Sequence, residues 1–241
     1  MEQFKEIVLE APPEGMEYII TKGENGKRII RLARLDREFF TKITADDREK
    51  VKIWLAQQIA KTSEENEFLD ILKVAVREVD YDYWIANLEP SVEHGKIRYE
   101  KGNNIAVGFC CSYWQKMAKE YDPQKGSRLC NLYELFIWYA LRIANKLWTL
   151  DYVANNSSNS GNYMNSPSSA ESMEKAGARV CGGYRDGQGN ASKIVATERG
   201  YLIIGGNYGS YGQFYPVASI SYPYHPDSVQ NFAVGVLILL K

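Results

Sequence analysis

Residues 131–148, NLYELFIWYALRIANKLW, are the stretch that most constrains how this chain can fold. Asn131 and Glu134 have the spacing of a helix cap and its third residue, so we predict that a helix begins after Asn131. Apolar residues then occur on nearly every side of this helix: Leu132, Leu135, Phe136, Ile137, Trp138, Leu141 and Ile143. A helix that is apolar all round belongs in the interior of a domain.

The rest of the composition is that of a globular protein, with 45% hydrophobic and 24% charged residues. A chain of 241 residues fits one large domain or two small ones. The formal net charge of -1 argues against a general nucleic-acid binder, which would carry a basic stripe. No apolar run reaches about 18 residues, so we expect no membrane span.

The first ten residues, MEQFKEIVLE, lack the basic region followed by an apolar region that marks a secretory signal. We therefore expect synthesis in the cytoplasm without a signal peptide. An outward-facing role would need another route of export, such as release inside a phage particle, so the expected location is a virion or else the cytoplasm.

Cysteine and histidine usage predicts neither disulfides nor a metal site. The four cysteines are Cys110, Cys111, Cys130 and Cys181. Adjacent cysteines do not readily bond to each other and no CxxC spacing occurs, so we expect buried, reduced thiols. Neither His94 nor His225 has ligand spacing to a cysteine, which argues against zinc. We expect no metal and no cofactor.

Charge is concentrated in the first hundred residues, which suggests two regions with different roles. We expect residues 1–80 to form a small α/β region for assembly or attachment, and residues 81–241 to form the ligand-binding domain. Within the first region, two apolar runs flank Asn25-Gly26, a strong signal for a β-hairpin.

Two helices are predicted after this hairpin. The first begins at Thr44, with Asp47 three residues later, and the second begins at Thr62, with Glu65 in capping-box spacing. The second helix carries one apolar stripe, formed by Phe68, Ile71, Leu72, Ala75 and Val79. This stripe indicates core packing, and docking against a partner protein or a second copy is the alternative.

From residue 81 onward the sequence predicts short strands, a helix over residues 110–121 and a turn over residues 122–128. After the apolar helix, the polar stretch 149–177 contains interleaved aromatic residues, which favour an ordered loop that covers another part of the protein. Short strands separated by Gly-containing turns follow over residues 179–206, and an apolar strand closes the chain at 233–240. The expected class is α+β.

Residues 205–232, GGNYGSYGQFYPVASISYPYHPDSVQNF, have an unusual composition. They contain five tyrosines, four serines, four glycines and three prolines, and no Lys, Arg or Glu. Antibody loops have a similar composition, because Tyr supplies contact area with few rotors while Ser, Gly and Asn supply adaptable hydrogen bonds. Ordinary loops of all-β proteins are the alternative.

The order of these motifs resembles the C-type lectin fold of formylglycine-generating enzymes and their relatives. Those proteins carry a helix, then G-x-R-L-P-T-E-x-E-W-E-Y-A, then a late R-G-G-S-W and a terminal G-F-R strand. The matching residues here are Gly126, Arg128, Leu129, Glu134, Gly205, Gly206 and Gly235. The resemblance covers residues 81–241 and implies a domain with two helices and short antiparallel strands.

This sequence departs from the family at functionally important positions. Cys130-Asn131-Leu132 replaces Pro-Thr-Glu, and Leu237 stands in place of the terminal Arg. The family's enzymes use two late cysteines for copper and oxygen chemistry, whereas no cysteine follows Cys181 here. The resemblance therefore implies a binding protein and not an enzyme, since a shared fold does not confer chemistry.

Among binding members, the layout is most similar to the variable proteins of diversity-generating retroelements, a family that includes phage tropism determinants. These place a diversified segment near the C-terminus, before a short apolar strand. The resemblance implies host attachment at a phage tail or fibre tip, through a host surface protein or glycan, and a homo-oligomer, by analogy a trimer. The alternatives are a non-variable lectin or adhesin, a structural virion protein or a degenerate enzyme.

We call the residues expected to bind this ligand the expected ligand face. They are Asn207, Tyr208, Ser210, Tyr211, Phe214, Tyr215, Ser219, Ser221, Tyr222, Tyr224, His225, Asp227 and Ser228.

Overall fold

The computed structural model describes residues 16–22, 28–34, 39–61, 65–87, 89–99, 105–154, 191–206, 217–227, 229–230 and 233–241. For residues 16–22, 28–34, 222–224 and 229 the description covers the path of the backbone. The chain divides into two compact units, Met1–Phe40 and Thr41–Lys241.

The first unit contains an antiparallel hairpin. Strand β1 (Met16–Lys22) pairs with β2 (Arg28–Arg34), with Lys22 opposite Arg28 at the closed end. This confirms the hairpin that was expected around Asn25-Gly26, although these two residues themselves lie outside the described part of the chain.

The second unit begins earlier than the sequence suggested, at Thr41 and not near residue 81. Its helices α1 (Ala45–Ile59) and α2 (Glu67–Glu78) pack against α4 (Leu132–Ala144). The ring centroids of Phe68 on α2 and Phe136 on α4 are 5.0 Å apart, and both residues belong to one continuous apolar core. The division therefore falls before α1, because α4 needs these two helices to cover its apolar surface.

The caps of α1 and α4 form as expected, whereas that of α2 does not. Thr44 and Asp47 complete a capping box at α1, and Asn131 and Glu134 complete one at α4. Helix α2 begins later than predicted, because Asn66 accepts a hydrogen bond from the backbone N–H of Leu69 at 3.1 Å. Thr62, the predicted cap, lies outside the described residues.

The remaining helices are shorter. They are α3 (Cys111–Tyr121), the 3-10 turn η1 (Pro123–Lys125) and α5 (Leu150–Ala154). Helix α4 is buried on all sides from Glu134 to Ile143, as its sequence predicted. Even Arg142 is buried there: its guanidinium carbon lies 4.6 Å from the ring centroid of Trp138 and 5.3 Å from that of Trp148, an arrangement that stabilises a buried cation.

The described strands of the second unit form two four-stranded and two two-stranded sheets, and their bounds are as follows. The first large sheet has the order β3 (Phe40–Ile43), β4 (Tyr83–Ala86), β14 (Leu237–Leu239), β8 (Arg128–Leu129). The second has the order β11 (Ile220–Tyr224), β10 (Gly200–Ile204), β9 (Ser192–Thr197), β13 (Ala233–Gly235). The small sheets pair β5 (Ser91–Glu93) with β6 (Lys96–Arg98) and β12 (Val229–Gln230) with β7 (Phe109–Cys110).

The C-terminal apolar run holds both large sheets together. Strand β13 pairs in parallel with β9, and β14 pairs with β4 on one side and β8 on the other. Gly235 lies where these strands meet, and a Cβ atom there would be 2.6 Å from Leu129 and 3.0 Å from Trp114. The last strands of the chain are thus central to its core.

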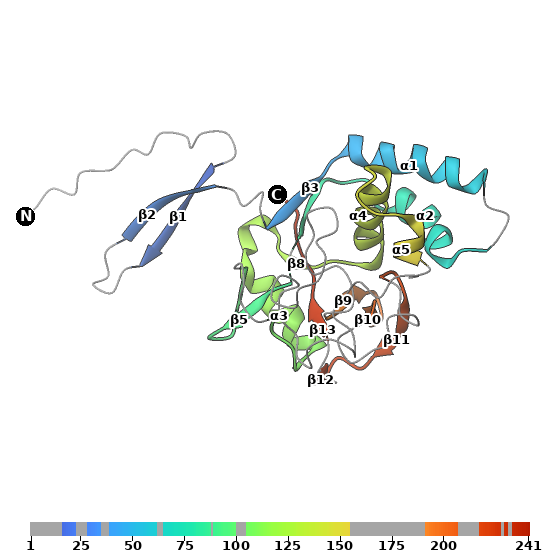
Figure 1. Ribbon diagram of the computed structural model, residues 1–241. Coiled ribbons are helices and arrows are strands. Elements are labelled where there is room, and N and C mark those ends of the chain that lie inside the picture. The colour runs from blue at the N-terminus through green and yellow to red at the C-terminus, as the bar shows by residue number, and fades with distance from the viewer. Residues whose placement is uncertain are drawn as a thin grey trace, which may run out of the picture. The chain divides into compact units, whose positions relative to one another are not determined.

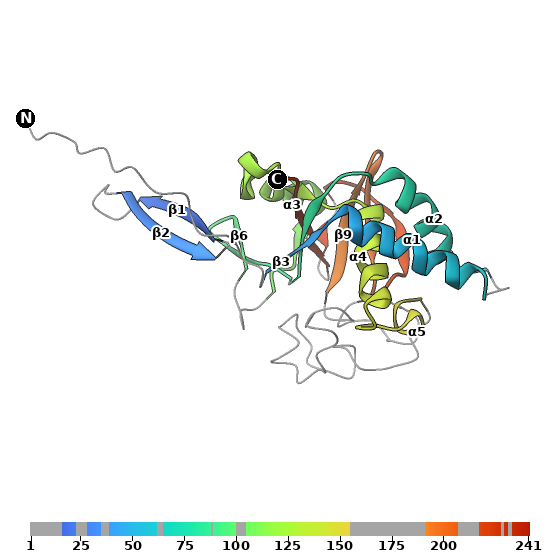
Figure 2. The same ribbon diagram turned by 90° about the horizontal axis from the view of Figure 1, so that it is seen from above.

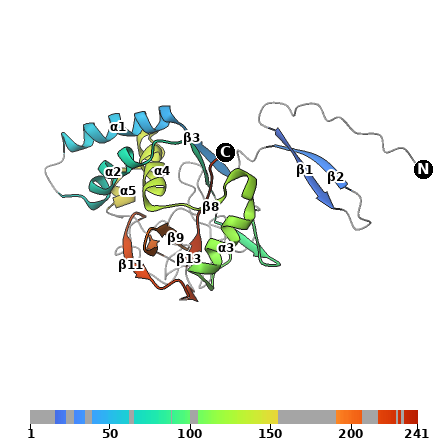
Figure 3. The ribbon, with the colours of Figure 1, turned by 180° about the vertical axis from the view of Figure 1, so that it is seen from behind.

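Helices lie on both sides of the second large sheet (Figure 1). Helices α1, α2 and α4 lie on one side of β9 and α3 lies on the other, which is clearest from above (Figure 2) and agrees with the view from behind (Figure 3). The expected α+β class is confirmed. In the described part of the chain, the helices are too short or too polar to cross a membrane.

Candidate ligand-binding surface

The expected ligand face is attached to the sheet at the ends of β10 and β11. The backbone N–H of Gly205 donates to the carbonyl of Ser219 at 2.8 Å, so the two ends of the connection between these strands are hydrogen-bonded to each other. Gly205 has a φ of 78°, and a Cβ atom there would lie 3.1 Å from the carbonyl oxygen of Val217. Both the left-handed backbone and the close approach favour glycine at this position.

The returning end of this connection is held by backbone contacts and small buried side chains. Val217 and Ala218 are both buried. The N–H of Ala218 donates to the carbonyl of Val153 in α5 at 3.0 Å. This end of the connection is thus fixed to α5 and to the core.

The turn after β11 is anchored in the same manner. The N–H of Ser112, in the first turn of α3, donates to the carbonyl of Pro226 at 2.9 Å, and the N–H of Gly108 donates to the carbonyl of Gln230 at 3.0 Å. Strands β12 and β7 add their own backbone pairing. Because these bonds use main-chain atoms, they do not depend on the identity of the side chains displayed by the turn.

Two side chains of this turn are well exposed, with 75% of His225 and 77% of Asp227 accessible to solvent. The hydroxyl of Ser112 donates to the Asp227 carboxylate at 3.1 Å, and the N–H of Asp227 donates to Nδ1 of His225 at 3.3 Å. Beside them, burial raises the pKa of the Tyr201 hydroxyl, as do the neighbouring Cys111, Cys110 and Asp227. The surface here is therefore polar and aromatic.

The structure describes part of the expected ligand face. His225 and Asp227 are exposed, whereas Ser219 and Ser221 are half-buried, and the buried Ser219 hydroxyl has no partner among the described residues. Tyr222 and Tyr224 lie in β11, where the backbone alone is described. The other expected residues lie outside the described part of the chain: Asn207, Tyr208, Ser210, Tyr211, Phe214, Tyr215 and Ser228. Cys181 and most of the polar stretch 149–177 also lie outside it.

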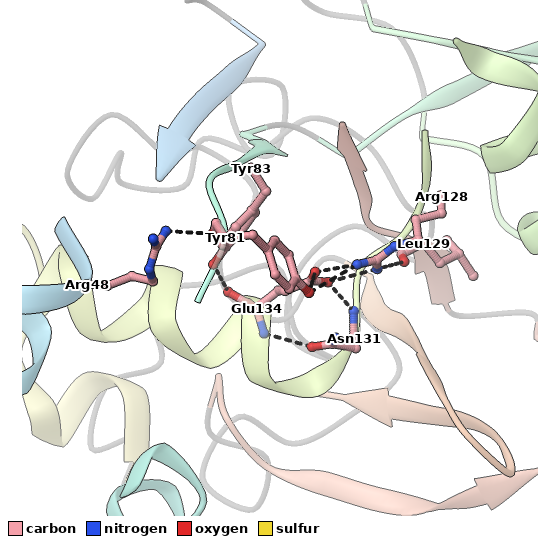
Figure 4. A network of polar contacts seen from close by, with 7 residues as sticks. All are labelled: Arg48, Tyr81, Tyr83, Arg128, Leu129, Asn131 and Glu134. Atoms are coloured by element: carbon pink, nitrogen blue, oxygen red, sulfur yellow. Dashed lines mark hydrogen bonds and ion pairs between the residues drawn. The ribbon is translucent and has the colours of Figure 1, made fainter. Parts of the chain in front are cut away.

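A buried polar network fixes the start of α4. We call Tyr81, Arg128, Asn131 and Glu134 the Glu134 network (Figure 4). The Glu134 carboxylate is fully buried and accepts two hydrogen bonds from Arg128, at 3.0 and 2.5 Å. It also accepts one from the Tyr81 hydroxyl at 2.6 Å and one from the Asn131 N–H at 2.8 Å. Each carboxylate oxygen thus has two donors, which is characteristic of a structural anion.

Further contacts join the Glu134 network to the surrounding elements. Tyr83 donates to the backbone carbonyl of Glu134 at 2.7 Å. Arg48 of α1 donates to the carbonyl of Tyr81 at 2.6 Å, and Figure 4 shows it on the side of Tyr81 away from Arg128. Burial, together with the hydrogen bond to Glu134, raises the pKa of Tyr81 to about 12. The network therefore links α1, β4, β8 and α4.

Sequence reasoning named Arg128 and Glu134 only as motif residues and Glu134 as part of a cap. It missed Tyr81, and it also missed a second buried ion pair between Lys193 in β9 and Glu89. No spacing along the chain links partners that are 53 or 104 residues apart.

An open groove lies at the start of α4, next to the Glu134 network. We define the α4 groove by Glu78, Leu132, Tyr133, Glu198, Arg199 and Leu202, which are among its lining residues. They come from the end of α2, the first turn of α4 and the hairpin formed by β9 and β10. The groove has a volume of about 610 Å³, within the usual range of ligand sites.

The described thiols are free: Cys110 is half-buried, and Cys111 and Cys130 are buried. Burial raises the pKa of Cys111 to about 11 and that of Cys130 well above its usual range. Both therefore favour the unreactive thiol form. No cluster of three metal-ligating side chains occurs among the described residues.

The sequence matches no protein-family model, and it has no match among curated proteins.

Proposed function

We propose that this chain is a ligand-binding protein, and that the expected ligand face displays replaceable side chains on a C-type-lectin-like scaffold. The proposal rests on how the segment that bears this face is attached to the rest of the domain. Main-chain hydrogen bonds at Gly205, Pro226 and Gln230 hold the segment that bears the face. Function-bearing loops on a rigid frame follow the same logic in antibodies, where side chains vary while the core does not.

The frame on each side of the face supports this proposal. Ile203 and Ile204 precede the face, and both are buried. After it, β13 and β14 are buried; β13 pairs with β9 at the end of the second large sheet, and β14 lies between β4 and β8 in the first. A segment held firmly at both ends loses less conformational entropy when it binds a partner, so a preorganised loop binds more tightly.

The composition of the face favours recognition over catalysis. Tyrosine is the most frequent residue in segment 205–232, and it is enriched among the residues that contribute most to binding energy at interfaces. The described buried cysteines are disfavoured as nucleophiles by their raised pKa values. By its resemblance to the variable proteins of diversity-generating retroelements, we infer a role in phage host attachment, with a host surface protein or glycan as the ligand.

The proposal is tested by replacing Tyr208, Tyr211 and Tyr222 together with alanine. We expect the triple variant to lose binding to host cells or to arrayed glycans and surface proteins, while its melting temperature stays within a few degrees of the wild type. A large fall in the melting temperature would contradict the proposal, because it would assign these rings to the core.

Whether the face is diversified is a separate question that genome sequence answers. The proposal expects a neighbouring reverse transcriptase gene and a near-repeat of the 3′ coding sequence that differs mainly at adenines. A genome lacking both would refute diversification and leave a fixed adhesin as the function.

We further propose that the first unit, Met1–Phe40, serves in attachment or assembly. A two-stranded hairpin is marginally stable alone in water, so it gains stability when it associates with another polypeptide chain. Light scattering of the intact chain and of a chain beginning at Thr41 tests this. We expect an oligomer for the first and a monomer for the second, and a monomeric intact chain would contradict assembly.

A further inference from the structure

We propose that the α4 groove is a second binding site, which takes a peptide segment that presents a lysine or arginine side chain beside an apolar residue. The inference goes beyond the proposed function, because the described residues that line the groove include none of the expected ligand face. It would let the protein hold a partner protein while the expected ligand face binds its own ligand.

The groove and the exposed turn at His225 and Asp227, which belongs to the described part of the expected ligand face, lie on opposite faces of one sheet. Leu202 lines the groove and packs against the main core on the side of α4. Tyr201, the preceding residue, interacts electrostatically with Cys110, Cys111 and Asp227. Consecutive residues of a strand point to opposite faces, so β10 separates the two surfaces.

The lining of the groove combines an apolar floor with free charges at its rim. Leu132, Tyr133 and Leu202 are only partly buried although each packs against the main core. Glu78 and Glu198 are exposed and have no ion-pair partner among the described residues, and the same holds for Arg199. The carboxylates come from different walls, since Glu78 ends α2 and Glu198 lies in the turn between β9 and β10.

This combination matches the chemistry of a basic side chain. Lysine and arginine have an apolar stem that packs on apolar surface and a cationic head that stays near water and anions. Carboxylates on two walls can flank such a head, while Arg199 can donate to the carbonyls of the bound peptide. Charge complementarity of this kind selects the partner more than it adds affinity, so we expect a specific but weak site.

The polar groups behind the groove keep its shape fixed and do not compete for the ligand. Tyr81 and Asn131 border the groove, but the Tyr81 hydroxyl donates to the Glu134 carboxylate and Asn131 Oδ1 accepts from the Glu134 N–H. Ligand recognition therefore falls to the charged side chains at the rim, which have no ion-pair partner in the described part of the chain. Because those side chains are exposed, neutralising them should change binding and leave folding intact.

The test uses two blocked pentapeptides with the intact chain, one with Leu-Lys-Leu at its centre and one with Leu-Glu-Leu. Titrations are followed by amide shifts in NMR spectra at low salt. We expect the lysine peptide to shift the amides of Tyr133, Thr197 and Leu202, and the glutamate peptide to bind at least several-fold more weakly. Equal binding of the two peptides, or shifts confined to other residues, would overturn the proposal.

Charge-neutralising variants make the test specific. Glu78→Gln and Glu198→Gln should each weaken the lysine peptide about two- to fivefold, as expected for exposed charges, and should lower its salt dependence. Glu120→Gln, on the exposed surface of α3, is the matched control and should leave binding unchanged. If the groove variants behaved like Glu120→Gln, the site would be refuted. The alanine variant of Tyr208, Tyr211 and Tyr222 should still bind this peptide, so failure here and failure of the proposed function can be told apart.

Discussion

Breaking the Glu134 network offers a sharp test of how this fold is stabilised. We predict that Glu134→Met lowers the free energy of unfolding by about 3 to 5 kcal/mol, the usual cost of removing one partner of a buried ion pair. Methionine is close to glutamate in size, so the loss does not arise from a cavity. Part of it reflects the backbone N–H of Asn131, which loses its acceptor although the Asn131 side chain still caps α4, and the rest reflects Arg128 and Tyr81 left without their acceptor.

The partial exposure of Arg128 sets where in this range the value falls. Its side chain keeps 28% of its accessible surface, so water can solvate it in part once Glu134 is gone. We therefore expect about 3 kcal/mol in place of the upper limit, measured by urea unfolding followed by circular dichroism.

A double-mutant cycle separates the ion pair from the other effects. Combining Glu134→Met with Arg128→Met should cost at least about 1 kcal/mol less than the sum of the two single changes, because no charge is then left buried and unpaired. A loss below about 1 kcal/mol for Glu134→Met, or simple additivity in the cycle, would show that this ion pair does not stabilise the fold.

Three further predictions follow from the packing, the titration and the capping of the second unit. Gly235→Ala should cost about 1 to 3 kcal/mol in thermal unfolding, because its methyl group would crowd Leu129 and Trp114, and a neutral result would contradict this contact. Tyr81 has a pKa raised from 10.0 to about 12, so the stability it contributes is present below pH 10 and is lost as the pH rises through 12. Tyr81→Phe should accordingly lose less stability than the wild type between those pH values, and identical pH profiles would be evidence against the raised pKa. Asn66→Ala should cost about 1 kcal/mol while Asn66→Asp costs little, since aspartate also caps helices; equal losses would show that Asn66 does not cap α2.

The helices were largely predictable from sequence because their signals are local. The caps at Thr44 and Asn131 lie within four residues of the groups they satisfy, and the all-round apolar pattern of α4 correctly predicted its burial. The start of α2 was wrong because Thr62 and Asn66 both precede a suitable apolar stripe, and spacing alone does not choose between two capping residues.

The sheets and the polar networks were less predictable because they join distant parts of the chain. The apolar pattern of residues 233–240 indicated a strand. It did not indicate that this strand divides into β13 and β14, which belong to different large sheets. The partnership of Tyr81 with Glu134, and that of Glu89 with Lys193, depends on tertiary packing alone. The α4 groove is likewise built from segments that are far apart in sequence, so no sequence motif predicts it.

We propose that the side chains of the expected ligand face can change while the scaffold does not. It is tested most directly by a displayed library in which all positions of the expected ligand face are randomised, with the fraction of folded members measured by protease resistance. We predict that most members fold as the wild type does, and that a matched library at Ile203, Ile204, Val234 and Leu237 mostly does not. If the two libraries lost folded members equally, the expected ligand face would be part of the core and this proposal would be wrong.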